Sequence, residues 1–285
     1  MFPASFDYRV AESIDEAISL YQSADGEARY LAGGHSLIPA MKLRLARPGR
    51  LIDIRPIEQL RYIRVGDDGA VHIGSLTTHA EIAASDVVAQ HAPLLAQAAK
   101  VIGDVQVRNM GTIGGSLAHN DPGADYPAAV LALEATITVQ GPNGTRHIAA
   151  TDFLKDMYET ALEPGEIIVD VAIPSYSGWK STYVKFFHPA SRYAVVGVAI
   201  LANADGNQVQ DIRIAYNGVA SCAFRDTAAE NALKGKAATD ATIAEAANAA
   251  LNGVDVLSDH FASAEFRKHI GRVYLKRALQ ELFAG

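Results

Sequence analysis

The interpretation of this chain starts from Ala32-Gly-Gly-His-Ser36, read together with Thr112-Ile-Gly-Gly-Ser-Leu-Ala-His-Asn-Asp-Pro-Gly-Ala-Asp125 about eighty residues later. Each segment joins adjacent glycines to a hydroxyl residue, so a backbone without side chains can approach a ligand and present N–H groups to its negative oxygens. Two such segments predict a long anionic cofactor. Neither contains G-x-G-x-x-G, and no G-x-x-x-x-G-K-[ST] occurs, so the Rossmann and P-loop fingerprints are missing.

The composition of the 285 residues is that of an ordinary soluble protein, with 49% hydrophobic and 20% charged residues. The net charge of −7 disfavours non-specific binding to nucleic acid. The single cysteine, Cys222, excludes a disulfide within the chain and any four-cysteine iron–sulfur or zinc site. No apolar run reaches the roughly 20 residues of a membrane span, and the N-terminus does not resemble a signal peptide. We therefore expect a cytoplasmic protein.

The first part of the chain predicts a small βαβ-like unit around the first glycine segment. Ser13-Ile-Asp-Glu16 is typical of a helix start, and a strand at 28–31 leads directly into the glycines. Ser36 is expected to cap the following helix, which would bury Leu37, Met41 and Leu45.

The rest of the chain predicts two further units. In the second, the glycine-rich segment from Met110 to Asp125 is expected to be a loop without regular structure, and Gly141-Pro-Asn-Gly144 predicts a hairpin. The turn at 175–178 predicts a boundary. Beyond it, alternating apolar residues predict a sheet with one face covered by helices. The strands are expected at 179–187, 194–203 and 209–219, and the helices at 223–233, 239–251 and 263–283.

Four landmarks in this order resemble the FAD-binding medium subunit of the molybdenum hydroxylases, the family of xanthine dehydrogenase and of the carbon monoxide dehydrogenase medium chains. They are Phe6-Asp-Tyr8, Leu31 to Pro39, Met110 to Gly115, and Glu163-Pro-Gly-Glu-Ile-Ile168. The resemblance implies an α+β chain. It would have a two-subdomain FAD-binding fold of the vanillyl-alcohol oxidase and murein reductase (PCMH) type over 1–55 and 56–175. A C-terminal domain of the CO dehydrogenase flavoprotein type would span 176–285.

The same resemblance implies which residues contact FAD. Thr112, Gly114 and Gly115 would line the phosphates and the ribityl chain, and Asp125 would accept hydrogen bonds from flavin hydroxyls. Ile102 and Ile168 would pack against the adenine and the flavin, and Lys185 and Tyr193 would flank the isoalloxazine ring. The full predicted set is Ala32, Gly33, Gly34, His35, Ser36, Leu37, Ile102, Gly111, Thr112, Ile113, Gly114, Gly115, Ala118, Asp125, Ile168, Lys185 and Tyr193.

The resemblance also implies a function for the chain within a larger enzyme. A large subunit would carry the molybdenum cofactor, a small subunit would carry [2Fe-2S] clusters, and this chain would pass their electrons to an external acceptor. No catalytic residue and no metal ligand are expected on this chain. The assembly would be a dimer of heterotrimers, with possible peripheral attachment to the inner face of the membrane through the partners. The substrate stays open between carbon monoxide, a purine, an N-heterocycle and an aldehyde.

Several alternatives remain at the level of single residues. His35 could carry a covalent flavin or a metal, and His119, Asn120 and Asp121 could form a metal cluster instead of a turn. Ile102 and Ile168 could be ordinary core residues, and Lys185 an exposed strand lysine. Cys222 is expected to be buried rather than reactive.

Alternatives also remain for the whole protein. A self-sufficient flavoenzyme of the same fold would act alone, and an adaptor that has lost its flavin would bind no chromophore. An NAD acceptor is disfavoured because Ser191 to Val196 stands where xanthine dehydrogenases carry an acidic run, so a quinone or dioxygen is expected instead. No G-x-S-x-G supports acyl transfer.

Overall fold

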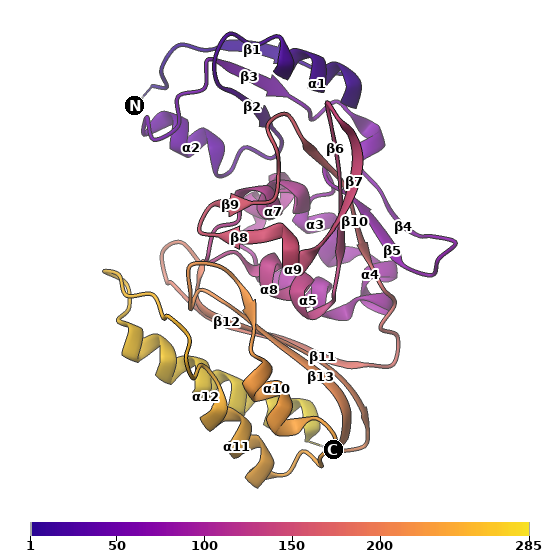
Figure 1. Ribbon diagram of the computed structural model, residues 1–285, viewed down its shortest axis with the longest axis vertical. Coiled ribbons are helices and arrows are strands. Elements are labelled where there is room, and N and C mark those ends of the chain that lie inside the picture. Colours follow the sequence, from indigo (N-terminus) through magenta and orange to yellow (C-terminus); the bar gives the residue numbers. More distant parts are fainter. Residues whose placement is uncertain (1, 285) are drawn as a thin grey trace.

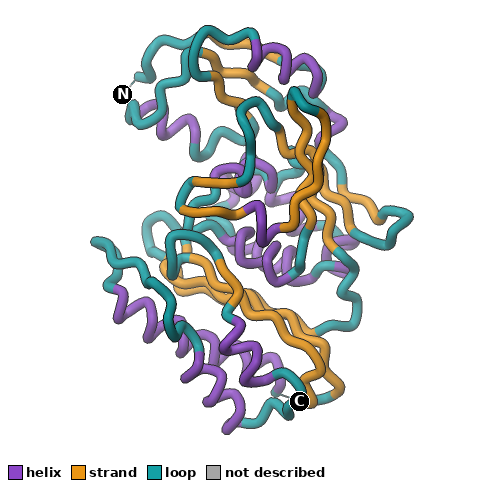
Figure 2. Tube along the Cα trace, in the orientation of Figure 1, coloured by secondary structure: helices purple, strands orange, loops and turns teal. Residues whose placement is uncertain are grey.

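The chain forms three larger sheets in succession, each with its own helices (Figures 1 and 2). The structure is a computed structural model that describes residues 2–284. In the first unit the strands are parallel, in the order β1-β3-β2. Ser13 caps the first helix by accepting a 3.1 Å hydrogen bond from the Glu16 N–H, as its sequence predicts. The elements are β1 (Asp7–Val10), α1 (Ile14–Gln22), β2 (Ala28–Leu31), α2 (Leu37–Lys42) and β3 (Arg50–Asp53).

The prediction for the second helix is partly wrong. Ser36 precedes α2, but its side chain makes no capping hydrogen bond. Met41 is buried, whereas Leu45 is 81% exposed. The reason is that α2 ends at Lys42 and the chain turns through Arg44, whose φ is +62°, so the helical periodicity does not extend to Leu45.

The second unit contains an antiparallel sheet in the order β4-β5-β10-β6-β7, packed against a group of short helices. The hairpin predicted around Gly141 to Gly144 is present as β6 and β7. The strands are β4 (Ile63–Val65), β5 (Val71–Gly74), β6 (Thr136–Gly141), β7 (Gly144–Ala149) and β10 (Ile167–Ile173), with a separate hairpin of β8 (Leu154–Asp156) and β9 (Glu159–Thr160). The helices are η1 (Glu58–Leu60), α3 (His79–Ala84), α4 (Asp86–His91), α5 (Pro93–Val101), α6 (Val105–Met110), α7 (Ile113–His119), α8 (Asp125–Ala132) and α9 (Ala150–Phe153).

The second glycine segment is not the irregular loop that its composition predicts. It forms α7, and Thr112 caps this helix by accepting a 3.1 Å hydrogen bond from the Gly115 N–H. Glycine lowers helix propensity by about 1 kcal/mol relative to alanine. Tertiary packing outweighs this cost, because Gly114 lies directly against Ser75. The glycines therefore permit close packing of a helix rather than the flexibility of a loop.

The third unit is an antiparallel sheet in the order β11-β12-β13-β14. One face, with Ile214 and Tyr216, packs on the C-terminal helices. The opposite face, with Ala199 and Leu201, joins the core of the second unit, so the sheet lies between α5 and α8 on one side and α10 to α12 on the other (Figure 1). The prediction that only one face is covered is therefore wrong. The elements are β11 (Lys180–Phe187), β12 (Ala194–Asp205), β13 (Gln208–Asn217), β14 (Phe224–Arg225), α10 (Thr227–Leu233), α11 (Asp240–Ala249) and α12 (Ala264–Phe283).

Packing on both faces explains the nearly continuous apolar sequence of β12, since a strand covered on both sides has no polar face. It also joins the third unit firmly to the second. None of the helices in residues 2–284 is long and apolar enough to cross a bilayer.

Candidate cofactor site

The two glycine segments meet in space although eighty residues separate them. A Cβ added to Gly33 would lie 2.8 Å from the Cα of Gly111 and would collide with the carbonyl of Met110. A Cβ on Gly115 would lie 3.9 Å from the methyl group of Ala32. The absence of a side chain at Gly33 is thus what lets the two segments touch, whereas the absence of one at Gly111 makes room for the His79 ring.

The first segment presents unused backbone donors. Within residues 2–284, the N–H groups of Gly33, Gly34, His35 and Ser36 donate to no protein acceptor. Gly34 has a φ of +74°, a left-handed conformation that glycine adopts without strain. Consecutive free N–H groups that precede a helix form a concave site for an anion such as a pyrophosphate.

The second segment differs, because the protein already uses its donors. The N–H of Ile113 donates to the Thr77 carbonyl (3.1 Å), and that of Gly114 donates to the Ser75 carbonyl (2.9 Å). The Gly115 N–H is bound by the Thr112 hydroxyl. The N-terminus of α7 therefore has no free N–H group among residues 113–115 to donate to a phosphate. It contributes a surface without side chains instead, since Gly115 and Ala118 are exposed one turn apart on α7.

A cavity of about 570 Å³ lies where the two segments meet. Five predicted residues line it: Ala32, Gly114, Gly115, Ala118 and Ile168. The segment from Tyr158 to Ile168 forms much of the opposite wall, and Tyr21 and Tyr30 lie at the N-terminal unit. Cavities of a few hundred Å³ at a junction of units are typical of cofactor sites.

One buried polar atom on this wall has no partner. The Ser75 side chain is 3% exposed, and its Oγ makes no hydrogen bond within the described chain. An unpaired buried hydroxyl costs free energy, and a ligand that hydrogen-bonds it would recover that cost. A long dinucleotide with an anionic centre fits this site. Glycines that allow close approach and an unpaired hydroxyl line the cavity, and the free N–H groups of residues 33–36 directly follow Ala32 on its wall.

Two matches to known families decide the identification. The family described as FAD binding domain in molybdopterin dehydrogenase matches residues 4–176, and the CO dehydrogenase flavoprotein C-terminal domain matches residues 181–282. The chain belongs to this flavoprotein family. The predicted family, fold class and cofactor, FAD, are thereby confirmed.

Full-length relatives agree with this assignment. The carbon monoxide dehydrogenase medium chain of Hydrogenophaga pseudoflava is 40% identical, over 100% of this chain and 99% of the relative. The glyceraldehyde dehydrogenase medium chain of Sulfolobus acidocaldarius is 36% identical, over 99% of this chain and all of the relative. The solved carbon monoxide dehydrogenase of H. pseudoflava superposes with a TM-score of 0.95 at 41% identity, covering 100% of this chain and 99% of that one. The solved quinoline 2-oxidoreductase from Pseudomonas putida 86 superposes with a TM-score of 0.94 at 33% identity, covering 100% of this chain and 99% of that one.

In this flavoprotein, Asp125 and Lys185 are buried and do not line the cavity. The Lys185 ammonium donates to Asp125 Oδ2 (3.0 Å), and the Tyr183 hydroxyl donates to Asp125 Oδ1 (2.6 Å). Both charged side chains are at most 5% exposed. Burial raises the pKa of Asp125 to about 6, against the opposing effect of Lys185, and burial lowers the pKa of Lys185. Direct contact of either residue with flavin remains a prediction, and the alternative of an exposed strand lysine at 185 is wrong.

Tyr193 reaches the first glycine segment from the third unit. Burial, and after it the nearby charge of Asp121, raises the pKa of its phenol to about 12, and the Ser36 side chain lies close enough to oppose this rise. Lys185 also donates to the Arg192 carbonyl (2.9 Å), which holds the chain just before Tyr193. Ser36 and Tyr193, which are far apart in sequence, therefore lie together, as a shared cofactor site requires.

The remaining predicted residues support the segments without lining the cavity. The Ile102 carbonyl accepts a hydrogen bond from Arg108 (2.9 Å), and Ile113 is fully buried. Leu37 packs beside Met41 in a small core. The exposed His35 turns its ring toward the Gly33 carbonyl (3.1 Å). No group of three or more His, Cys, Asp or Glu side chains within residues 2–284 is arranged to hold a metal ion.

Sequence reasoning missed Ser75, Tyr158, Tyr21 and Tyr30 on the cavity wall. Ser75 directly follows β5 and Tyr158 sits in a two-residue turn, so neither belongs to a glycine motif. The sequence offers one indication, for Ser75 alone: this residue stands three positions before the capping box that begins at Thr78. Such a signal is too general to identify a cofactor residue without the fold.

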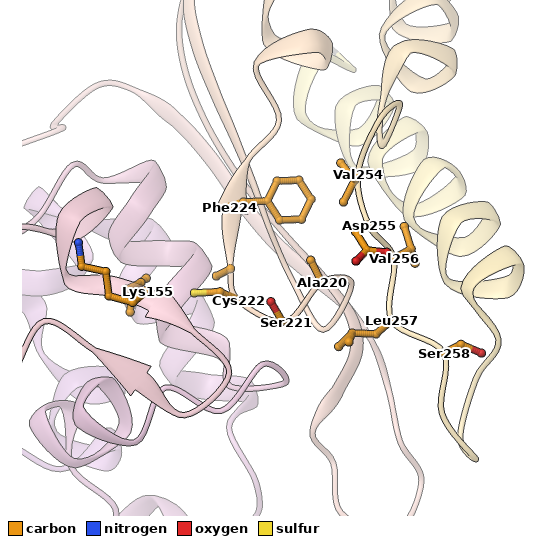
Figure 3. A pocket seen from close by; sticks show the side chains of 12 residues that line it. Lys155, Ala220, Ser221, Cys222, Phe224, Val254, Asp255, Val256, Leu257 and Ser258 are labelled. Carbon is orange, nitrogen blue, oxygen red and sulfur yellow. The ribbon is translucent and has the colours of Figure 1, made fainter.

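A second cavity, of about 550 Å³, lies between β8 and two segments of the third unit (Figure 3). It contains none of the predicted residues. Cys222 lies on its wall, and burial raises the pKa of the thiol, which disfavours the reactive thiolate. The expected unreactive role of Cys222 agrees with this environment. The lining residues are Leu154, Lys155, Ala220, Ser221, Cys222, Ala223, Phe224, Val254, Asp255, Val256, Leu257 and Ser258.

Proposed function

We propose that this chain holds FAD in the cavity between its first two units and serves as the electron-transfer subunit of a molybdenum hydroxylase. The observation that carries the proposal is that the loop at residues 33–36, with its free N–H groups, contacts the segment that leads into α7. The chain is also similar over its full length to a carbon monoxide dehydrogenase medium chain. FAD, when bound, supplies a centre that exchanges one or two electrons. The protein supplies binding, orientation and electrostatic environment.

Each part of the site has its own task in this proposal. The N–H groups of residues 33–36 bind the pyrophosphate, and the exposed face of α7 at Gly115 and Ala118 lets the cofactor lie close to the helix. Ile168 provides an apolar contact for the flavin, and Tyr193 provides an aromatic one. Lys185 and Asp125, whose charges are paired, hold the segment that carries Tyr193.

The partners follow from the medium-chain relatives. A large molybdenum-cofactor subunit would oxidise the substrate, and a small subunit with [2Fe-2S] clusters would deliver the electrons, in a dimer of heterotrimers. Because Ser191 to Val196 replaces an acidic run, we favour a quinone or dioxygen as acceptor over NAD. We also propose the division into 1–55, 56–175 and 176–285, which follows the three sheets, and a cytoplasmic location.

The test is co-expression of this chain with the genes beside its own, followed by purification. We expect a yellow full-length chain with one FAD, co-isolating with molybdenum and iron–sulfur subunits, whose flavin is reduced only when those subunits and substrate are present. A colourless chain that takes up no added FAD would refute cofactor binding. A yellow chain that turns over substrate alone would show a self-sufficient flavoenzyme instead.

A further inference from the structure

Tyr158, a residue outside the predicted set, lies on the cavity wall and in the turn between β8 and β9. Figure 1 shows this hairpin beside α7. Its φ is +58°, in the left-handed region. Residues other than glycine, Asn and Asp seldom adopt this conformation. The residue is 57% exposed, so no core packing compensates the strain. The chain thus holds a tyrosine in an unfavourable conformation, next to the surface formed by Gly115 and Ala118.

The turn is fixed to the end of α7 by one buried side chain. The amide of Asn120 donates to the carbonyls of Asp156 and Glu159, both at 2.8 Å. The Tyr158 N–H donates in return to the Asn120 carbonyl (3.1 Å). Asn120 is 1% exposed. Three hydrogen bonds through Asn120 therefore join the hairpin to the end of the helix.

The ring of Tyr158 is also held in place. It packs on the ring of His119 with centroids 5.0 Å apart, and its hydroxyl donates to Asp121 Oδ2 (3.3 Å). The same Asp121 helps to raise the pKa of Tyr193, after burial, and Tyr158 is a further neighbour of that phenol. Two tyrosines from different units therefore converge near one carboxylate, at the edge of the site.

A purely structural role does not explain this arrangement. A two-residue turn with a positive φ at its second position is best served by glycine or Asn, which avoid the strain. Strained residues that the surrounding structure holds in place are common where a ligand binds. The exposed aromatic face at this position has no protein partner other than His119 among the aromatic contacts of the described chain.

We propose that Tyr158 is a further cofactor-binding residue, whose ring forms a wall of the pocket for the isoalloxazine ring together with Ile168 and Tyr193. The inference rests on the proposed binding of FAD. A planar aromatic side chain that is already fixed by Asn120 and Asp121 loses little conformational entropy when the flavin packs on it.

The test compares Tyr158→Gly with Tyr158→Phe in the full-length chain, by titration with FAD and by the emission of the bound flavin. Glycine removes the ring and also relieves the backbone strain. We expect FAD affinity to fall about tenfold, within the range of an aromatic contact, and emission of the bound flavin to rise. Thermal stability of the FAD-free chain should be unchanged or higher. Tyr158→Phe keeps the ring and should bind FAD within about twofold of the original chain.

Met157→Ala is the matched control, because Met157 lies in the same turn and is 42% exposed but does not line the cavity. Tyr158→Asn, which also tolerates the left-handed conformation, repeats the measurement should glycine loosen the hairpin. An original chain that binds no FAD defeats the proposed function itself. An original chain that binds FAD, with glycine and Asn variants of equal affinity and equal emission, overturns only the role of Tyr158.

Discussion

The two glycine segments look alike in sequence but do different work in the fold. In residues 33–36 the backbone N–H groups are free, whereas in Ile113 to Gly115 the protein has already bound them. The glycines of the first segment allow a loop conformation and contact with Gly111, and those of the second allow α7 to pack against Ser75. A glycine pair therefore indicates close approach of a backbone. Whether a ligand or another part of the protein approaches it depends on where the donors point.

The largest effect is expected where the two segments touch. In Gly33→Val, side-chain atoms would overlap the Met110 carbonyl and the Gly111 Cα. These are backbone atoms, so relieving the overlap would require a costly shift of the main chain. We expect FAD affinity to fall by about a hundredfold or more, equivalent to about 3 kcal/mol. Titration of the purified chain with FAD measures it.

Two controls accompany this variant. Gly49→Ala in the same unit meets only the Asp25 and Glu27 carbonyls, at 3.4 and 3.6 Å, and should bind FAD normally. Emission of the single tryptophan, Trp179, which packs on Tyr176, should be unchanged if the third unit stays folded. Undiminished FAD content in Gly33→Val would show that contact between the segments does not build the site.

The neighbouring glycines of α7 should respond differently to alanine. At Gly114 a Cβ would lie 2.8 Å from the Ser75 carbonyl oxygen, so Gly114→Ala should lower the free energy of unfolding by about 1–3 kcal/mol. At Gly115 a Cβ meets only the Thr112 hydroxyl at 3.0 Å and Ala32 at 3.9 Å. The gain in helix propensity is opposed by the 3.0 Å contact with the capping hydroxyl of Thr112, so Gly115→Ala should change the free energy of unfolding by less than about 0.5 kcal/mol. It should nevertheless weaken FAD binding about tenfold, because the methyl group enters the cavity.

Urea unfolding without FAD and titration with FAD separate the two quantities. The idea that the face of α7 lies against the cofactor would be abandoned if Gly115→Ala bound FAD as tightly as the original chain.

Acid should weaken the packing of the second segment through His79. His79 is buried against Gly111, and burial, with nearby His35 and Arg108, lowers its pKa to about 3. The unfolded chain binds this proton near pH 6.5, so the unfolded state holds more protons between pH 6.5 and 3, and stability falls as the pH falls through that window. From pH 7 to pH 5 the loss due to His79 should be about 2 kcal/mol.

The measurement is the difference in unfolding free energy between pH 7 and pH 5 for the original chain and for His79→Phe, which cannot titrate. That difference should shrink by about 2 kcal/mol in the variant. An equal pH dependence in the two proteins would remove His79 as the acid-sensitive group.

The smallest expected effect is the difference in stability between alanine variants of Thr112 and Ser36, the two hydroxyl residues that precede α7 and α2. Thr112 caps α7 with its side chain, so Thr112→Ala should cost about 1 kcal/mol of stability in the FAD-free chain. Ser36 makes no such bond before α2, and Ser36→Ala should change stability by less than about 0.5 kcal/mol. Thermal unfolding of both variants tests this pair. A larger loss for Ser36→Ala would mean that the hydroxyl caps α2 in solution.

Local patterns predicted much of the fold. Ser13 begins α1, Gly141 to Gly144 turns between β6 and β7, and the three long strands of the third unit lie where apolar runs indicate them. These features depend on contacts between residues close in sequence, which periodicity and capping describe well. The errors occurred where distant packing decided the outcome. Gly114 is helical because Ser75 is its neighbour, and both faces of β12 are buried because α8 lies on one of them.

By itself the sequence determined the family and the cofactor, and it singled out the two glycine segments, since these follow from residue types in a fixed order along the chain. Only the tertiary structure decided that the first segment keeps its donors free and that Lys185 pairs with a buried Asp125. It also brought Ser75 and Tyr158 to the wall. The physical reason is that hydrogen bonds and burial depend on which groups are neighbours in space, and these neighbours lie tens of residues apart in the chain.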